Sequence, residues 1–346
     1  GRKMSKSLGN GVDPIEVIEQ YGADTLRFML VTGNTPGNDL RFQFERLEGT
    51  RNFANKIWNA SRFVLMNLAD YVPGSQIPQY TLADRWILAK YNQTVAEVTS
   101  CLENYELGEA ARFIYEFIWN QFCDWYIELI KPRLYGKETP VSKYTAQYVA
   151  SYVLTNTLQL LHPFMPFITE EIWQHLPGTG KTIMYAKWPE CSALFEDETS
   201  EKEMDILMEA TRAIRNIRAE MNVPPGKKAE VIVITENKEC QVIMEKGKKY
   251  VASRGEKPQK AATAIVGDLE IFLPLEGLID LELEIKRLEK ELSQTRKELD
   301  RLSGKLKNQG FLNKAPQDII EKEQAKETEM LIKEKALLER LEMFQD

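Results

Sequence analysis

The sequence is poor in the residues that hold metals or form disulfides. Its 346 residues include 4 cysteines and 2 histidines, and no two cysteines form the C-x-x-C pair typical of zinc sites. This pattern predicts neither a bound metal nor a disulfide framework. Scattered free cysteines are typical of a reducing compartment, so we expect a cytoplasmic protein.

Long apolar runs are also missing. No stretch approaches the roughly 18 apolar residues that cross a membrane, and the first residues do not have the pattern of a signal peptide. The hydrophobic content of 43% still suffices for a core, and the length suits two or three domains. We expect a soluble monomer without membrane contact.

Acidic residues outnumber basic ones, 52 to 45, so the net charge is −7. Its distribution is uneven: residues 190–209 are strongly acidic, whereas Lys and Arg outnumber Asp and Glu over residues 227–260. Local charge governs attraction to phosphates more than the total does. The net charge therefore does not exclude a nucleic-acid partner.

Helical periodicity dominates the first half of the chain. Residues 13–30 begin with an N-capping Asp13, with Glu16 placed to complete a capping box and Gly22 interrupting the helix. Further helical patterns cover residues 44–70, 82–103, 107–130, 141–161 and 161–176. Their wide apolar faces predict a helical bundle.

Two details of this bundle follow from residue spacing. The helical spacing of large apolar residues in the segment 117–130 places four of them in the core: Phe117, Phe122, Trp125 and Leu129. Asp124 and Arg85 are interpreted as a buried ion pair.

The remaining half changes character twice. After a helical pattern at 203–222, residues 229–234 and 264–275 have the alternation and β-branched content of strands. Apolar residues then recur in alternating steps of three and four with one polar member, a heptad seam: Leu278, Leu281, Ile285, Leu288, Leu292, Thr295, Leu299, Leu302 and Leu306. A short turn at 310–316 precedes a second helix with Met330, Leu331, Leu337, Leu338 and Leu341.

We therefore predict a mainly α fold with a helical bundle, a small α/β module and a C-terminal antiparallel coiled-coil hairpin. Four parts are expected. Residues 1–43 form an N-terminal loop and stem, residues 44–190 the bundle, residues 191–276 an acidic linker with the α/β module, and residues 277–346 the hairpin.

The first ten residues, GRKMSKSLGN, place Lys3 and Lys6 on a glycine-flanked loop. Two ammonium groups on such a loop suit a polyphosphate whose charge shifts during a reaction. One such contact contributes about 4 kcal/mol before desolvation, at ~4 Å and an effective dielectric constant near 20. Taken alone, however, a short basic loop is better explained as exposed surface.

The longer context changes this interpretation. KMSKSLGNGVDP followed by YGADTLRF resembles the signature of class I aminoacyl-tRNA synthetases, in the group that charges valine, isoleucine and leucine. The resemblance implies that Lys6, supported by Lys3, stabilises the leaving pyrophosphate. It also implies an ATP-binding set: Lys3, Met4, Ser5, Lys6 and Ser7. We expect residues 1–12 to lack fixed structure without a catalytic half.

The resemblance continues through residues 51–67, 84–92, 117–135 and 161–173, which are similar to the helical anticodon-binding domain of the same synthetases. One polar face there, with an aromatic side chain for stacking, suits the reading of unstacked bases. Its members are Arg51, Asn55, Lys56, Asn59, Arg62 and Phe63. A solvated surface role explains each single member equally well.

The C-terminal segments 275–292 and 305–316 resemble the coiled coil of the valyl-tRNA synthetases, which contacts the outer corner of tRNA. Cationic side chains on this arm suit phosphate contacts: Lys290, Arg296, Lys297, Arg301 and Lys305. An ordinary solvated coiled-coil flank is the competing explanation.

The resemblance implies the C-terminal tRNA-binding part of an enzyme that activates valine with ATP and Mg²⁺ and transfers it to tRNA(Val). The sequence has no HIGH motif, and we expect it to lack the Rossmann core and the editing domain. This chain alone should therefore bind tRNA without charging it and hold no cofactor tightly. The alternatives are the same region of an isoleucyl or leucyl enzyme, a non-catalytic tRNA-binding module, or a structural hairpin protein without RNA affinity.

One further motif is similar to a phosphate-binding motif but does not match it fully. PGTGKT (177–182) is similar to a phosphate-binding P-loop, but His175 stands where that pattern needs its first glycine. A predicted helix, rather than a strand, precedes it. We interpret the segment as a loop that terminates the helix.

Overall fold

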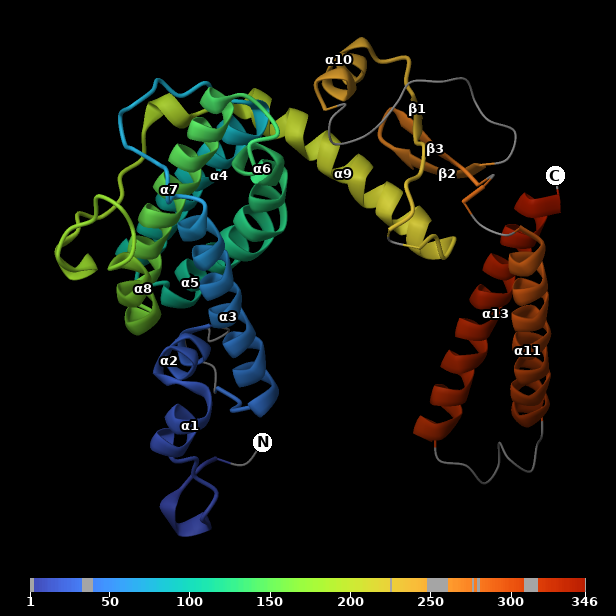
Figure 1. Ribbon diagram of the computed structural model, residues 1–346. Helices are drawn as coiled ribbons and strands as arrows, with labels where there is room; N and C mark the ends of the chain where they lie inside the picture. Colours follow the sequence, from blue (N-terminus) through green and yellow to red (C-terminus); the bar gives the residue numbers. More distant parts are fainter. Residues whose placement is uncertain are drawn as a thin grey trace. The chain divides into compact units, whose positions relative to one another are not determined.

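The computed structural model describes residues 3–32, 40–224, 226–247, 261–275, 277–278, 281–307 and 317–345. The chain divides into two compact units, Gly1–Met204 and Asp205–Asp346, called unit 1 and unit 2 below. Helices predominate in both, and unit 2 contains a small antiparallel sheet (Figure 1). The predicted mainly α fold class is confirmed.

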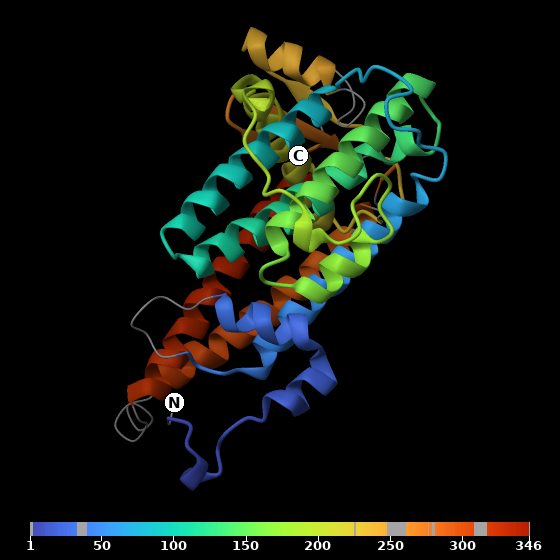
Figure 2. The same ribbon diagram turned by 90° about the vertical axis from the view of Figure 1, so that its left-hand side faces the viewer.

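Unit 1 is a helical bundle preceded by two short helices, α1 (Pro14–Tyr21) and α2 (Ala23–Val31). Asp13 caps α1 by accepting a hydrogen bond of 2.8 Å from the Ile15 N–H. Gly22 separates the two helices with a φ of 89°, a conformation that favours glycine. The predicted cap and interruption are therefore confirmed. Figures 1 and 2 show both helices, in dark blue, at one end of the bundle.

The bundle itself consists of six α-helices and one π-helical segment. These are α3 (Phe44–Met66), α4 (Leu82–Glu103), α5 (Leu107–Glu116), η2 (Phe117–Tyr126), α6 (Ile127–Leu134), α7 (Pro140–Leu161) and α8 (Pro166–Trp173). The predicted helix over 107–130 is thus longer than expected and has a wider middle part, η2. Such π-helical turns are rare in proteins and are common at functional sites.

Aromatic side chains fill the centre of unit 1. Trp86, Tyr91 and Phe53 are almost completely buried. Phe117 and Phe122 are buried as predicted. Two other predicted core residues, Trp125 and Leu129, are only half-buried.

The predicted buried pair between Asp124 and Arg85 is wrong. Asp124 instead accepts a hydrogen bond of 2.6 Å from Lys56, and Arg85 pairs with Asp197 at 3.1 Å. All four side chains are at least partly exposed. Helical spacing alone does not show which neighbouring helix supplies a partner, so the sequence suggested the wrong combination.

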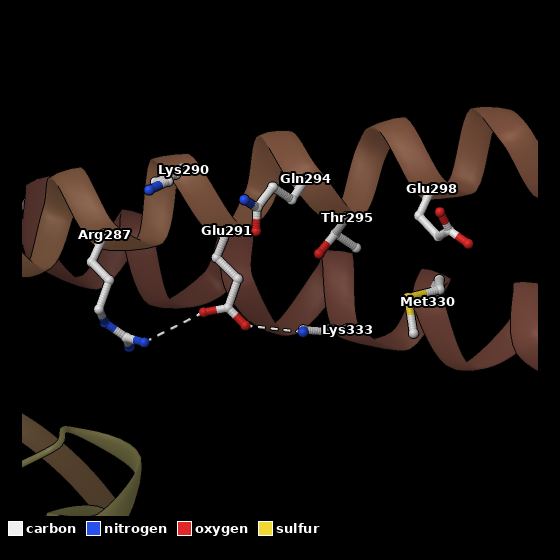
Figure 3. Close-up of a pocket in the computed structure, with 8 residues that line it drawn as sticks. All are labelled: Arg287, Lys290, Glu291, Gln294, Thr295, Glu298, Met330 and Lys333. Carbon is white, nitrogen blue, oxygen red and sulfur yellow. Dashed lines mark hydrogen bonds and ion pairs between the residues drawn. The ribbon is translucent and has the colours of Figure 1, made fainter.

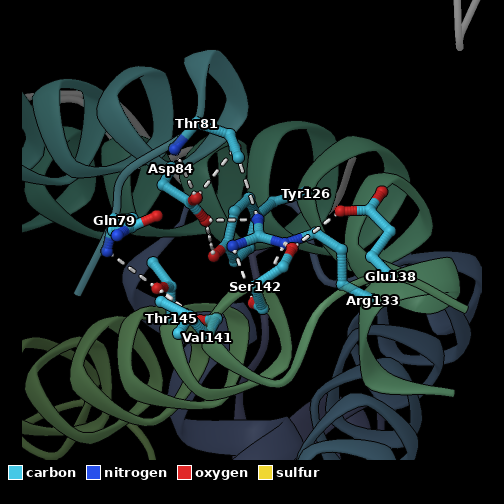
Figure 4. A network of polar contacts seen from close by, with 9 residues as sticks. All are labelled: Gln79, Thr81, Asp84, Tyr126, Arg133, Glu138, Val141, Ser142 and Thr145. Carbon is cyan, nitrogen blue, oxygen red and sulfur yellow. Dashed lines mark hydrogen bonds and ion pairs between the residues drawn. The ribbon is translucent and has the colours of Figure 1, made fainter. Parts of the chain in front are cut away.

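The buried ion pair of the bundle joins Asp84 of α4 to Arg133 of α6 (Figure 4). The Arg133 Nη1–Asp84 Oδ1 distance is 2.8 Å, and the two side chains are 2% and 0% exposed. Tyr126 donates to the same carboxylate at 2.8 Å, as does the Thr81 N–H. Arg133 also donates to the Ser142 carbonyl of α7 at 3.0 Å from Nη2. One charged pair therefore links α4, η2, α6 and α7.

Unit 2 begins within α9 (Glu198–Glu220) and contains β1 (Ile232–Ile234), α10 (Lys238–Lys246), β2 (Ala261–Val266) and β3 (Leu269–Pro274). The strand order is β1-β3-β2, and both pairings are antiparallel. The predicted strand segment 264–275 thus forms most of a hairpin that turns at Gly267, where φ is 53°. Helix α10 was not predicted, although Asn237 caps it through hydrogen bonds from the Glu239 and Cys240 N–H groups.

The C-terminal hairpin consists of α11 (Leu281–Lys307) and α13 (Gln317–Gln345), which lie side by side (Figures 1 and 2). The heptad seam is confirmed on α11, where five members are buried: Leu288, Leu292, Thr295, Leu299 and Leu302. The turn at 310–316 lies outside the described residues. Leu288, Leu292, Leu337 and Leu341 belong to the same buried cluster as Ile271 of β3. The end of the hairpin next to the sheet therefore shares the apolar core of unit 2.

Loss of the buried cation should cost far more stability than loss of an exposed one. We expect Arg133→Met to lower the free energy of unfolding by about 3–5 kcal/mol, because Asp84 is left charged and buried. The matched variant Arg85→Met, which breaks the exposed pair with Asp197, should cost less than about 1 kcal/mol. Urea unfolding followed by circular dichroism measures both. Equal losses for the two variants would contradict this account of the network.

Candidate nucleic-acid interface

The N-terminal loop is closed by Asn10. Its side-chain oxygen accepts from the Ser5 N–H at 2.9 Å, and its Nδ2 donates to the Lys3 carbonyl at 3.3 Å. A short 3₁₀ turn, Lys6–Leu8, lies inside this closure. The expectation that residues 1–12 lack fixed structure without the catalytic half stays a prediction.

The loop presents a cation and hydroxyl groups. Lys3 and Met4 are exposed, and the Ser5 and Ser7 hydroxyls lie 3.2 Å apart. The side chain of Lys6 lies outside the described residues, so its role stays a prediction. Asn10 was missed as part of the loop, and the only sequence signal for it was its position beside two glycines.

The predicted polar face of α3 is partly confirmed as a surface. Four of its six members are exposed: Arg51, Asn55, Asn59 and Arg62. Lys56 is half-buried, because it pairs with Asp124 and its Nζ lies 3.8 Å from the Trp119 ring centroid. Lys56 is therefore engaged within the bundle, and the exposed four are better placed to reach a ligand.

The sixth member, Phe63, forms an aromatic pair with Tyr135 just beyond the end of α6. The ring centroids are 6.4 Å apart and the planes are nearly perpendicular. Tyr135 is 58% exposed, and the Lys131 Nζ lies 5.7 Å from the Phe63 centroid. Phe63, Tyr135, Lys131 and the exposed Arg62 are called the ring-pair site below. An exposed ring such as Tyr135, supported by the half-buried Phe63 and close to a cation, suits stacking of single-stranded bases and contact with their phosphates.

Sequence reasoning missed Tyr135 and Lys131. Both lie in the segment 117–135, but the spacing along one helix does not show which residues of α6 meet α3. A signal was nevertheless present, because Pro132 and Gly136 mark the end of a helix next to an aromatic residue.

The predicted arm cations differ in their partners. Arg296 pairs with Glu334 at 2.6 Å and Lys305 with Glu323 at 3.0 Å, both across the hairpin. Arg301 pairs with Glu298 within α11. The other two, Lys290 and Lys297, are exposed, and the structure records no ion pair for them within the described residues. These two lysines are therefore the most accessible phosphate contacts on the arm.

Helix α13 meets α11 with acidic as well as apolar side chains. Glu323 and Glu334 are 14% and 22% exposed, whereas Leu331, which we expected to contribute to the apolar face of this helix, is 52% exposed. The Lys305 ammonium group hydrogen-bonds to Glu323 and lowers the pKa of that carboxyl below its ordinary value of 4.5. Away from the apolar end, ion pairs across the hairpin therefore accompany the buried seam residues Leu299 and Leu302.

A shallow groove of about 490 Å³ lies between the two hairpin helices (Figure 3). Glu291 is at its centre and accepts from Lys333 at 2.9 Å and from Arg287 at 3.5 Å. Thr295 and Met330 also line it, with Met330 close to Glu298 and Lys290 toward the other end (Figure 3). Since acidic and basic groups alternate along it, the groove offers no uniform charge to a ligand.

Two general findings concern the described residues. No three His, Cys, Asp or Glu side chains come together there as a metal site would require. None of the helices described combines the length and the apolar composition needed to cross a lipid bilayer.

Three family models match separate parts of the chain. The class I tRNA synthetases (I, L, M and V) match residues 1–43, the anticodon-binding domain of tRNA ligase matches residues 84–233, and the valyl tRNA synthetase tRNA binding arm matches residues 280–345. The hairpin and most of the bundle thus fall within matched regions.

Individual proteins match as well. Valine–tRNA ligases from Carboxydothermus hydrogenoformans and Oceanobacillus iheyensis are 56% and 49% identical to the chain, and each alignment covers 99% of it. The chain spans about 40% of the length of these relatives. Among solved structures, a Mycobacterium tuberculosis methionyl-tRNA synthetase in complex with methionyl-adenylate has a TM-score of 0.46 and 26% identity, covering 52% of this chain and 36% of that chain.

Acid should loosen the part of the hairpin held by Glu323. Because the pKa of Glu323 is depressed in the folded chain, the stability from its pair with Lys305 is complete above pH 4.5 and is lost as the pH falls through the lower, folded value. We expect amide protection in residues 320–327 to fall between pH 6 and pH 3. Hydrogen exchange corrected for intrinsic rates measures this.

The variant Glu323→Gln should already have the lower protection at pH 6 and should change less on acidification. Glu298→Gln removes a pair within α11 only, and it serves as the matched control. The account is wrong if both variants reproduce the pH profile of the unaltered chain.

Proposed function

Because the chain belongs to the valine–tRNA ligase family, we propose that it is the tRNA-binding part of an enzyme that activates valine with ATP and joins it to tRNA(Val). The relatives that support this are longer than the chain. Activity, substrates and partner are therefore proposed for the whole enzyme, and tRNA binding is proposed for this chain.

The ring-pair site is the observation that carries the proposal. Two rings, Phe63 of α3 and Tyr135 just beyond α6, lie beside Lys131. Tyr135 and Lys131 fall within the region 84–233 that matches an anticodon-binding domain, and α3 precedes that region. Stacking on a ring contributes about 1–3 kcal/mol per base and is tolerant of sequence, while neighbouring polar groups read base edges. The exposed Asn55 and Asn59 are the candidates for that reading.

The hairpin supplies the second contact. Lys290 and Lys297 are directed to solvent from a helix that matches a tRNA-binding arm. Contacts of lysine with phosphates position a nucleic acid without reading its sequence. Arg296, Arg301 and Lys305 contribute positive potential, although each already has a carboxylate partner.

The N-terminal loop is proposed to contact ATP. An exposed Lys3 beside the Ser5 and Ser7 hydroxyls fits a polyphosphate, which needs cations and hydrogen-bond donors. When bound, ATP would supply the α-phosphoryl group that the valine carboxylate attacks, with pyrophosphate as the leaving group. Lys3 and Lys6 would orient the phosphates and offset negative charge that develops on the departing pyrophosphate. We propose that Mg²⁺ accompanies the nucleotide in the whole enzyme.

We retain the four-part division at residues 43, 190 and 276 as a proposal, with residues 44–190 as the anticodon-binding domain and residues 277–346 as the arm. We also propose that the protein is a monomer and acts in the cytoplasm. Without the rest of the enzyme, this chain is proposed to hold no nucleotide tightly.

Binding of tRNA tests the proposal directly. We expect the chain to bind a tRNA(Val) transcript more tightly than tRNA(Ile) or tRNA(Leu) in a filter assay. Tyr135→Ala should weaken that binding about 5- to 100-fold through lost stacking. The exposed Tyr105 lies elsewhere on unit 1, and Tyr105→Ala should leave binding unchanged. Equal affinity for the three tRNAs would contradict anticodon reading.

The salt dependence of the same binding separates the arm from the bundle. Replacing Lys290 and Lys297 together by Gln should reduce the slope of log K against log salt by about two, one for each lost phosphate contact. Preference among the three tRNAs should persist, because phosphate contacts carry little sequence information. An unchanged slope would remove these two lysines from the interface.

The proposed catalytic lysine is tested in the full-length enzyme. Lys6→Ala should slow valine-dependent exchange of pyrophosphate into ATP by about 10²–10³-fold, the effect of removing one group that stabilises developing charge. Binding of tRNA should not change. Lys137→Ala, at an exposed lysine of the bundle, is the control, and a Lys6 variant with normal exchange would refute the assignment.

A further inference from the structure

Unit 1 contains a cavity that the proposed function does not use. It has a volume of about 370 Å³ and lies between α7, α8 and the loop that follows α8. Pockets for small molecules begin at about 300 Å³. The loop contributes the PGTGKT segment, which the sequence analysis set aside as a helix-terminating loop.

The loop around the cavity is fixed by hydrogen bonds to α8. The Trp173 indole donates to the Gly180 carbonyl at 2.9 Å, and Thr179 donates to the Trp173 carbonyl at 3.0 Å. Glu170 accepts from the Thr182 hydroxyl at 2.8 Å and from the Ile183 N–H at 3.2 Å. The cavity is therefore built into the fold and does not have to form around a ligand.

The side chains that line the cavity have an unusual combination of properties. Lys181 and Lys187 both line it, and no Asp or Glu does. Tyr185 is 88% exposed at its edge, so that most of its ring is open to contact. The Gln159 side-chain oxygen is buried at the wall without a hydrogen-bond partner among the described residues. A buried acceptor of this kind is destabilising until a donor reaches it.

We propose that this cavity binds a single nucleotide, carried by a bound RNA or free. The base stacks on Tyr185, the phosphate lies between Lys181 and Lys187, and a small adjustment of the Gln159 amide lets its oxygen accept from an exocyclic amino group. Stacking, a cationic phosphate contact and one edge contact are together the means by which proteins hold unstacked bases. For RNA as the source, the inference rests on the proposed function.

The cavity is separate from the ring-pair site. Ser142, which contacts Arg133 near Tyr135, lies close to the start of α7, whereas Gln159 lies close to its end. Seventeen residues of helix at 1.5 Å each place the two sites about 25 Å apart along α7. An RNA that reaches both must therefore place several nucleotides between them, and each site can be removed without the other.

Binding measurements on the whole 346-residue chain test the cavity. With a tRNA(Val) transcript as the probe, Tyr185→Ala should weaken binding about 5- to 100-fold, and Tyr185→Phe, which keeps the ring, should restore most of it. Replacing Lys181 and Lys187 together by Gln should reduce the salt slope by about two. Tyr105→Ala and Lys137→Gln are the matched controls on the same unit.

A second experiment uses free nucleotides as the probe. Saturation-transfer NMR with CMP should give a signal that Tyr185→Ala abolishes, and UMP should give a weaker one, because uracil carries a carbonyl where cytosine carries the amino group. A CMP signal without any effect of the variants on tRNA binding identifies a free nucleotide as the source and supports the cavity.

The outcomes separate the two proposals. If Tyr135→Ala weakens tRNA binding, while Tyr185→Ala does not and CMP gives no signal, the cavity proposal is overturned and the proposed function stands. If the chain does not bind tRNA at all but CMP binds at Tyr185, the proposed function fails and the nucleotide site stands.

Discussion

The contact between Asp84 and Arg133 is the constraint on which the geometry of the bundle depends. Two opposite charges buried without water hold their positions only if nearly every donor and acceptor is satisfied. Thr81, Tyr126 and Ser142 meet that demand (Figure 4). Each of these partners belongs to a different part of the chain, so the pair fixes where α4, α6 and α7 meet. Tyr135 follows Arg133 by two residues, and its ring takes its position from this junction.

The hairpin in unit 2 is stabilised differently along its length. Leu288, Leu292, Leu337 and Leu341 share a buried cluster with the sheet, where apolar burial dominates. Farther along, Arg296 and Lys305 face Glu334 and Glu323 across the seam. Exposed ion pairs contribute little stability compared with apolar burial. The arm is therefore joined to the sheet by apolar burial, and farther along α11 the buried Leu299 and Leu302 are flanked by ion pairs.

Much of this fold was predictable from the sequence, because periodicity reports directly on local structure. The steps of three and four from Leu288 to Leu302 identified the coiled coil, and Asp13 with Gly22 identified a capped and interrupted helix. Pairings between distant elements were not predictable in this way. Asp124 was assigned to Arg85 instead of Lys56, and Glu323 and Glu334 were not recognised as residues facing the seam.

The candidate sites differ in the same way: a site made of sequence neighbours was predictable, and a site made of distant residues was not. Lys3, Ser5 and Ser7 are neighbours in sequence, and a motif sufficed to bring them together. Phe63 was named from its helix face, but its partner Tyr135 lies 72 positions away and depends on how α3 meets α6. The cavity beside Tyr185 could not be predicted from the sequence. A loop that ends a helix has the same composition whether or not it encloses a cavity.

Thr295 affects how the two helices of the hairpin align with each other. A seam of leucines alone gives equivalent packing when one helix slides past the other by a heptad, a shift of about 10 Å. A single buried hydroxyl among those leucines makes the shifted alignments unequal, because only one of them matches it to the same neighbours. One threonine therefore selects a single alignment of the two helices and thereby sets the length over which the hairpin extends.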